Sequence, residues 1–330
     1  RNGKQIPVGE AYDREFERYL VRMFLEQYPE VVAKFLDSPE SAKLPVEARV
    51  LASLALEPKA SASRVAGLLP KLDRAPNEEE LLRLAQFPEE AGCGDALKAL
   101  LSKADSRASV ADKLLAQKTK LAPAKIAPLL NDAAKALLSG TDDERATAVA
   151  LIGGFQLVSL ENDLVAMVKQ KANVVPALQA LRELRSGASD VFAELAKSPE
   201  PMIRDEALAA LTASKNPNAA EQLFALYPSL SLPQQRAALN ALSSTKAGAK
   251  AIVAAIAANK LPKTDLDGPM AERLSIVLGD DAELAKLMTG LGHVFHNVLA
   301  FDGSDDAWVD SKITLDGPFT VETWVRLSEK

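Results

Sequence analysis

Aromatic residues, cysteine and histidine are all scarce in this 330-residue chain. Aromatic residues make up 5% of it although 48% is hydrophobic, so its core must consist largely of alanine, leucine and valine. That composition favours closely packed helices. The single cysteine, Cys93, excludes an internal disulfide, a cysteine-based zinc site and a C-x-x-C-H haem attachment within this sequence.

Motifs of several enzyme classes are also missing. There is no P-loop, no dinucleotide-binding glycine pattern and no G-x-S-x-G nucleophile turn. Acidic pairs such as Asp142 with Asp143, and Asp280 with Asp281, precede apolar helical runs, where carboxylates stabilise a helix N-terminus. The sequence therefore identifies no catalytic residue and no cofactor site of its own, and whether the protein is an enzyme stays open.

An excess of basic charge and a long apolar run are absent too. The 39 basic and 45 acidic residues give a net charge of −6, which argues against non-specific binding to nucleic acid or to anionic lipid. No apolar run approaches the roughly 20 residues that cross a bilayer, so we expect no transmembrane segment. A signal-peptide pattern is absent as well, but the chain begins at Arg1 and localisation cannot be read from that absence.

A short motif recurs through the middle of the chain. It has alanine first and apolar residues second and fifth, and its last position advances by 29, 30 and 31 residues between copies. Such a period is typical of stacked helical pairs, because each unit can bury its apolar face only against its neighbours. The copies are Ala148 to Ile152, Ala177 to Leu181, Ala207 to Leu211 and Ala238 to Leu242.

Residues around the motif extend this prediction. Between the copies lie partner helices, expected at 161–171, 189–198, 218–228 and 247–260. An arginine precedes three copies, and we expect it to reach an acidic residue of a neighbouring repeat. These arginines are Arg145, Arg204 and Arg236.

The predicted fold is mainly α, an alpha-alpha superhelix with a short C-terminal β segment that begins a β-sandwich. We expect a linker at 1–10, degenerate helical repeats at 11–140 and regular repeats at 141–292. Within the degenerate part, Gly92 in the GCGD stretch is expected to take a positive φ between two helices.

The first helix is the most aromatic one. Asp13 is expected to cap it, and aromatic residues crowd one end: Tyr12, Phe16, Tyr19, Phe24 and Tyr28. Two interpretations are open. The helix either closes the end of the solenoid, as atypical terminal repeats do, or forms a docking face for a preceding domain, with its arginines making ion pairs across the interface.

The pattern changes near residue 293. Asp-Gly turns occur at 302–303 and 316–317, and apolar or threonine side chains alternate with other residues along 319–327. This period of two predicts a half-buried strand.

The recurrent motif resembles short HEAT-like repeats, an armadillo-like class found in phycobilisome-lyase-type proteins. The resemblance covers 140–260 well and 30–140 loosely. Because HEAT repeats are scaffolds, it implies protein binding and spatial organisation rather than chemistry. The expected partners are protein domains that flank or dock on the solenoid.

The C-terminal stretch resembles the opening of a laminin-G-like, concanavalin A-like jelly-roll domain. The resemblance rests on F-D-G-x-D-D-x-W-V at 301–309 and F-T-V-E-T-W-V at 319–325. A complete domain of this family is several times longer than 293–330, and three strands bury too little surface to be stable alone. We therefore expect the natural chain to continue beyond Lys330.

Taken together, the chain is similar to the middle of large multidomain proteins of planctomycete and related bacteria. Those proteins carry a dehydrogenase-like β-propeller before the repeats and often a c-type cytochrome domain after the jelly roll. The resemblance implies an exported protein, periplasmic or extracellular, whose oxidoreductase activity and haem c would lie outside this chain.

Candidate ligand sites all lie near the C-terminus. His293 and His296 form an H-x-x-H pair without an evident third metal ligand, so we interpret them as linker residues. The candidate calcium ligands are Asp302, Asp305 and Asp306, although turn formation also explains these aspartates. The candidate sugar-stacking residues are Trp308 and Trp324, for which core packing is the alternative.

Two functional hypotheses follow. The first is a non-catalytic scaffold that positions a carbohydrate-binding or adhesive jelly roll. The second is the structural middle of a secreted oxidoreductase with electron transfer. Mass spectrometry of the natural full-length chain, combined with a visible haem spectrum, distinguishes them, because a mature chain that ends near Lys330 without haem contradicts the second.

Overall fold

A computed structural model describes residues 8–290 of the chain. This part contains eighteen α-helices and six short 3-10 helices, and no strand occurs among the described residues. The mainly α prediction is confirmed for them. Residues up to Gly279 form one compact unit, and α18 (Ala282–Gly290) belongs to a second unit that begins at Asp280. The domain boundaries expected at 10, 140 and 292 stay predictions.

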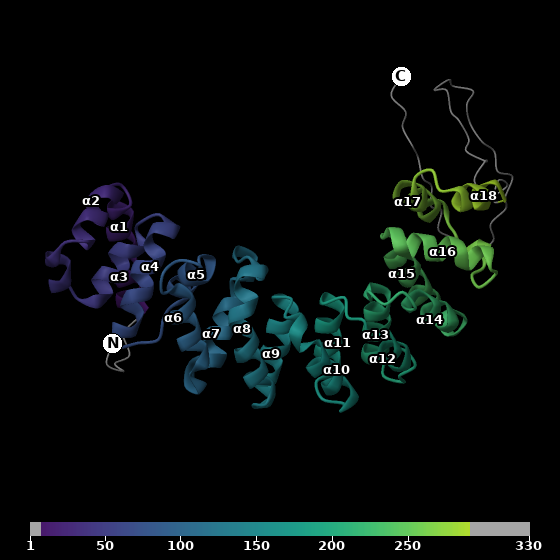
Figure 1. The fold of residues 1–330 in the computed structure, drawn as a ribbon, viewed down its shortest axis with the longest axis horizontal. Helices are drawn as coiled ribbons and strands as arrows, with labels where there is room; N and C mark the ends of the chain where they lie inside the picture. The colour runs from purple at the N-terminus through teal and green to yellow at the C-terminus, as the bar shows by residue number, and fades with distance from the viewer. Residues whose placement is uncertain (1–7, 291–330) are drawn as a thin grey trace, which may run out of the picture. The chain divides into compact units, whose positions relative to one another are not determined.

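Eight α-helices precede the regular repeats (Figure 1). Three of them, α2, α4 and α8, have proline in their first turn, where its missing N–H costs nothing. The helices are α1 (Val8–Leu25), α2 (Pro29–Leu36), α3 (Val46–Leu54), α4 (Pro58–Leu68), α5 (Glu78–Gln86), α6 (Cys93–Ser102), α7 (Ala104–Ala116) and α8 (Pro123–Leu138), with 3-10 helices at Pro39–Lys43, Leu69–Lys71 and Lys118–Lys120.

Nine α-helices follow up to Gly279. The four motif copies lie in α9, α11, α13 and α15, and the predicted partner helices are confirmed as α10, α12, α14 and α16. The bounds are α9 (Asp142–Gly154), α10 (Glu161–Lys169), α11 (Val174–Glu183), α12 (Ser189–Leu195), α13 (Pro201–Ala213), α14 (Ala219–Leu226), α15 (Leu232–Ser243), α16 (Lys246–Ala257) and α17 (Gly268–Leu278), with 3-10 helices at Val158–Leu160, Tyr227–Ser229 and Lys263–Asp265.

Local sequence explains where the motif helices begin. Thr141 and Glu144 form a capping box, in which each side chain bonds the backbone N–H of the other residue. Ser231 and Gln234 form the same arrangement at the start of α15. Each cap satisfies N–H groups that have no partner within the helix, so the chain enters the helix at a defined residue.

The motif helices pack side by side in chain order. Helix α9 contacts α11, α11 contacts α13, α13 contacts α15, and α15 contacts α17. Partner helices α12, α14 and α16 form a second row in the same way. The first alanine of every motif copy is buried, with 0% of Ala148 and 5% of Ala238 exposed. The motif therefore forms the contact between successive repeats, as expected for a helical solenoid.

Two glycines serve the packing of this unit. Gly92 has a φ of 77°, which confirms the positive φ predicted for it. A Cβ on Gly153 of α9 would lie 3.1 Å from the Ala180 Cα of α11 and 2.7 Å from the Glu183 Oε2. Helices α9 and α11 therefore approach so closely that any side chain at Gly153 requires movement.

Hydrogen bonds between loops connect successive repeats. The Gln156 side chain donates to the Glu183 carbonyl at 3.1 Å, and the Ser214 hydroxyl donates to the Ser186 carbonyl at 2.7 Å. The Glu161 carboxylate accepts from the Ser186 hydroxyl at 2.7 Å. It also accepts from the Gly187 N–H and from the Lys215 ammonium. One carboxylate thus joins loops of two later repeats.

The predicted role of the motif arginines is wrong. Arg145 bonds the Gly140 carbonyl and Asp142, both within its own repeat. Arg204 lies 3.5 Å from the Ser198 carbonyl and 3.8 Å from Asp205, again locally, and Arg236 forms no ion pair with a described residue. An arginine near a helix N-terminus reaches the preceding loop more easily than the next helix, which explains this local pairing.

The beginning of α1 also differs from the prediction. The helix starts at Val8, so Asp13 lies inside it and does not cap it. The predicted β segment lies outside the described residues.

Candidate functional site

Helices α1 and α2 carry most of the large hydrophobic side chains exposed on the described part of the chain. Nine of the fourteen such side chains fall between residues 16 and 35. Monomeric proteins rarely expose large contiguous apolar patches, and such patches typically mark interaction sites. We call these nine residues the aromatic surface: Phe16, Tyr19, Leu20, Val21, Met23, Phe24, Tyr28, Val31 and Phe35.

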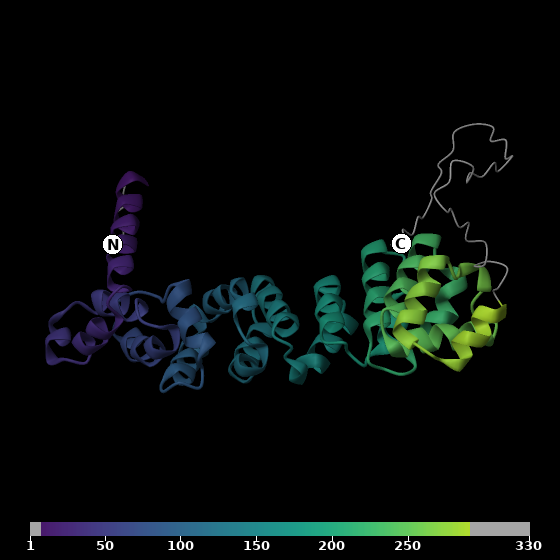
Figure 2. The same cartoon turned by 90° about the horizontal axis from the view of Figure 1, so that it is seen from above.

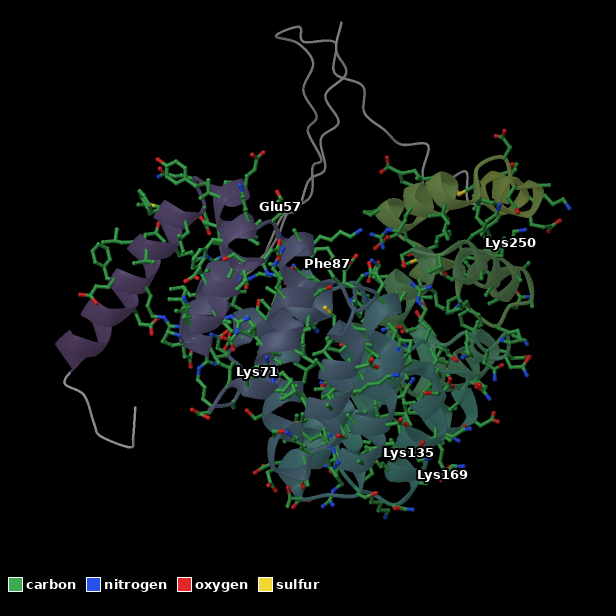
Figure 3. All side chains as sticks on the ribbon, turned by 60° about the vertical axis from the view of Figure 1, so that its left-hand side comes forward. Glu57, Lys71, Phe87, Lys135, Lys169 and Lys250 are labelled. Atoms are coloured by element: carbon green, nitrogen blue, oxygen red, sulfur yellow. The ribbon has the colours of Figure 1, made fainter. Side chains whose placement is uncertain are left out.

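Helix α1 turns Arg22, rather than its described aromatic side chains, toward the neighbouring helices. Arg22 donates to Glu79 of α5 at 2.5 Å and to Glu26 at 2.8 Å, and 26% of its side chain is exposed. In contrast, Tyr19 is 61% and Phe24 59% exposed. In Figure 2, α1 extends away from the helices that follow it, and Figure 3 shows its side chains projecting into open space. Helix α1 thus exposes large hydrophobic side chains, whereas a typical surface helix buries them against the core.

The anchor of α1 is an ionic cluster on α5. Glu79 also lies 3.6 Å from Arg83, of which 7% is exposed. Burial lowers the pKa of Arg83, and the Nη1 of its guanidinium is buried without a hydrogen-bond partner among the described residues. Burial also acts to lower the pKa of Arg22, but its hydrogen bonds to Glu79 and Glu26 outweigh this effect and raise it. Glu79 is thus shared between Arg22 and Arg83.

Helix α2 extends the same surface. Val32 is buried at 6% exposure, while Val31 next to it is 66% exposed. The rings of Phe24 and Tyr28 lie 5.3 Å apart at 53°, a tilted arrangement that stabilises the bend between the two helices. Buried Val32 thus attaches α2 to the core, and the contact between Phe24 and Tyr28 joins the parts of the aromatic surface that α1 and α2 contribute.

Other side-chain clusters of the described part serve the fold. Glu80 is fully buried and accepts hydrogen bonds from Arg74 and from the cap residue Asn77. Arg74 also pairs with Glu47 of α3 through two hydrogen bonds, at 2.7 and 2.8 Å. This network joins α3 to α5 and leaves the Glu80 carboxylate fully engaged, so we assign it to stability.

Two further groups, Cys93 and Tyr227, have raised pKa values. Burial raises the pKa of the Cys93 thiol to about 11, so it is protonated at neutral pH and a poor nucleophile. Burial and a hydrogen bond to Asp265 raise the pKa of Tyr227. An open cleft of about 510 Å³ lies beside Tyr227, between Lys260 and Lys263. Lys260 forms an ion pair with Glu221, so the two lysines that line the cleft are not both unpaired positive charges.

A second open groove, of about 350 Å³, runs along α9 and α11. Its lining includes Lys118, Gln179 and Glu183, together with three alanines and Gly153. Small side chains and few polar groups give it little to hold a specific ligand.

Within residues 8–290, no group of three or more histidine, cysteine, aspartate or glutamate side chains is placed to hold a metal ion. None of the described helices is long and apolar enough to cross a membrane. The chain shows no significant sequence match to a protein-family model or to a curated protein.

The candidate ligand residues predicted from the sequence lie outside the described residues. These are His293 and His296, the calcium candidates Asp302, Asp305 and Asp306, and the sugar-stacking candidates Trp308 and Trp324. The sequence did single out the aromatic helix, but it missed the contribution of α2. The signal was present, because Val31 and Phe35 continue the apolar spacing beyond Pro29.

Proposed function

We propose that this protein is a non-catalytic interaction scaffold whose helical array presents the aromatic surface of α1 and α2 to a neighbouring protein or domain. The observation that carries the proposal is the concentration of nine exposed large hydrophobic side chains on two consecutive helices. Exposed apolar area of this kind is stabilised when another protein covers it.

The organisation of the array supports a scaffolding role. Motif helices contact each other in succession, and carboxylates such as Glu161 bond the loops of later repeats. Each repeat therefore restrains its neighbour, and a partner bound at one end is held at a defined position on the array. Of the two interpretations open for the first helix, the exposed side chains favour docking over closure of the solenoid end.

The finer proposal concerns the C-terminal segment. Its support is the resemblance of 301–309 and 319–325 to a laminin-G-like jelly roll. On this proposal the array positions a carbohydrate-binding or adhesive domain within an exported protein. The natural full-length protein would then bind at least one member of a broad polysaccharide panel, and removal of calcium with a chelator would weaken that binding. A protein that binds no polysaccharide contradicts this part.

Site-specific photo-crosslinking tests the docking role. A photoreactive phenylalanine replaces Phe24 in the natural full-length protein, in its native cells. We expect a crosslink to one defined protein or to a defined part of the same chain. Ile276 on α17 is the matched control, because it is 77% exposed and apolar but lies outside the aromatic surface.

Crosslinking at Ile276 with the same product and yield contradicts the proposal, because it shows collision rather than docking. Failure to crosslink at Phe24 and also at Tyr19, the most exposed of the aromatic side chains described in α1, contradicts it as well.

A further inference from the structure

The aromatic surface has carboxylates along both edges of α1, and this pattern bears on what binds there. Successive residues of a helix are rotated by about 100°, so Phe16, Tyr19, Leu20, Met23 and Phe24 fall within an arc of about 140°. By the same rotation, the adjoining positions on the two sides of this arc are occupied by Glu17 on one side and by Glu15 and Glu26 on the other.

These carboxylates reach solvent. Glu17 is exposed and has no ion-pair partner among the described residues. Glu15 has 69% and Glu26 47% of its side chain exposed. The neighbouring Glu30 at the start of α2 is exposed as well.

Arg18 and Arg22 lie farther from the stripe than these carboxylates. By the same rotation, Arg18 falls opposite the stripe and Arg22 falls beside Glu15. Arg18 lies 3.6 Å from Glu15 and Arg22 donates to Glu26 at 2.8 Å, so the two carboxylates of that edge form ion pairs within α1. Arg22 is also held by Glu79 of α5. The positions that adjoin the apolar stripe of α1 are thus occupied by carboxylates. Glu15 and Glu26 share their charge with arginines, and Glu17 on the other edge has no ion-pair partner among the described residues.

A second copy of this chain fits the stripe poorly. Two such helices packed face to face would bring carboxylates against carboxylates along both edges, in either orientation. The net charge of −6 on each chain adds to this repulsion. A partner with positive edges avoids the penalty and gains attraction.

Building on the docking role proposed above, we propose that the aromatic surface binds an amphipathic helical segment whose apolar stripe is flanked by lysine or arginine. Its apolar side chains cover Phe16, Met23 and Phe24, and its cations lie beside Glu17 and Glu26. Helix-on-helix recognition of this kind uses apolar anchors at i, i+3, i+4 and i+7, the spacing that α1 itself presents.

Two synthetic helical peptides test this inference against the full-length protein. Both have about 18 residues, matching α1 in length, and the same leucine stripe, but one is flanked by lysine and the other by glutamate. Isothermal titration is expected to show binding of the lysine peptide at least about tenfold tighter than that of the glutamate peptide. The preference should shrink at high salt, because the edge charges are screened.

Variants locate the binding. Glu17→Lys is expected to weaken binding of the lysine peptide about fivefold, which is a modest effect suited to exposed charges. The matched control is Glu194→Lys, because Glu194 is an exposed carboxylate within α12 and its reversal changes the net charge equally. The control should change the affinity by less than about twofold. Phe24→Ser should weaken binding at least tenfold, with unchanged helical circular dichroism.

Several outcomes overturn the inference. These are equal binding of both peptides, equal effects of Glu17→Lys and Glu194→Lys, and dimerisation of the protein that Phe24→Ser abolishes. If Phe24 crosslinks to a defined partner but the lysine peptide does not bind, the partner chemistry is wrong and the docking role stands. If the peptide does not bind and Phe24 and Tyr19 give no crosslink, both proposals fail.

Discussion

At the scale of single residues, Arg185 has a left-handed backbone conformation, which is unfavourable for a residue that carries a side chain. It follows helix α11 with a φ of 50°, as Gln156 follows α9 with a φ of 57°. The left-handed conformation commonly ends a helix, but glycine adopts it with least strain. Arg185 is exposed, so contacts of its side chain do little to offset the unfavourable free energy of this backbone conformation.

Arg185→Gly is therefore expected to stabilise the protein by about 1 kcal/mol despite the flexibility of glycine in the unfolded chain. The free energy of unfolding from urea titration measures the gain. Arg185→Ala is the control, because alanine keeps the Cβ that causes the strain. Equal stabilisation by alanine and glycine would show that loss of the positive charge, rather than relief of strain, is responsible.

Glu161 makes stability depend on pH. Burial acts to raise its pKa, but hydrogen bonds from Ser186, Gly187 and Lys215 outweigh burial and lower it below the ordinary value. A carboxyl whose pKa is lower in the folded state stabilises the fold above its unfolded pKa, near 4.3, and this stabilisation is lost as the pH falls through the folded pKa.

Glu161→Gln should therefore cost about 1 kcal/mol at pH 7, because the amide forms weaker hydrogen bonds with Lys215 and the loop. The difference from the unaltered protein should persist down to about pH 5 and shrink below about pH 4.3. Thermal unfolding across this range measures it. Glu194→Gln, at an exposed position of α12, is the control and should show little difference at any pH. A difference for Glu161→Gln that is the same at pH 3 and pH 7 would exclude the charge as its cause.

At the scale of helices, the contact between α9 and α11 depends on the absence of a side chain at Gly153. A Cβ there would lie 3.1 Å from the Ala180 Cα and 3.2 Å from the Ala180 Cβ. Both distances are shorter than ordinary carbon contacts, so an added methyl group would push the two helices apart.

Gly153→Ala should destabilise the protein by about 1 kcal/mol or more, although alanine favours the helix itself. The next residue supplies a matched control, because a Cβ at Gly154 would meet its nearest neighbour, Leu115 Cδ2, at 3.4 Å. Gly154→Ala should be neutral or stabilising, as expected from helix propensity alone. Chemical denaturation of the two variants decides this, and a loss at Gly154 equal to that at Gly153 contradicts close packing as the cause.

The same helices show what the sequence can predict. The alanine motif located α9, α11, α13 and α15, because a period near thirty residues reflects contacts that each repeat must make with the next.

The partners of Arg145 and Arg204 were not predictable, because a long side chain can reach several carbonyls and carboxylates that lie at similar distances. The orientation of α1 could not be predicted either, because its arginines and its aromatic residues have equivalent helical spacing. Pairing of Arg22 with Glu79, a residue 57 positions away, decides which side faces solvent.

At the scale of the unit up to Gly279, stability should vary along the chain. A central helix such as α11 contacts α9, α10 and α13, and its loop is bonded by Glu161. Helix α1 has few neighbours, and its main anchors are the α3 contact and the Arg22 ion pair. In arrays of repeats each unit is stabilised chiefly by adjacent units, so a terminal helix opens more readily than a central one.

Hydrogen exchange followed by mass spectrometry should therefore show faster exchange in α1 than in α9 and α11. Opening of α1 frees the aromatic surface from its anchors without unfolding the repeats, so its exchange reports on α1 alone. Binding of the lysine-flanked peptide should slow exchange in α1 and α2 and leave α11 unchanged, because a ligand stabilises the folded form of the segment that it contacts. Phe24→Ser should remove this protection. Protection spread evenly over the array would instead mean that the peptide binds along the repeats, and the role of α1 as the docking element would be contradicted.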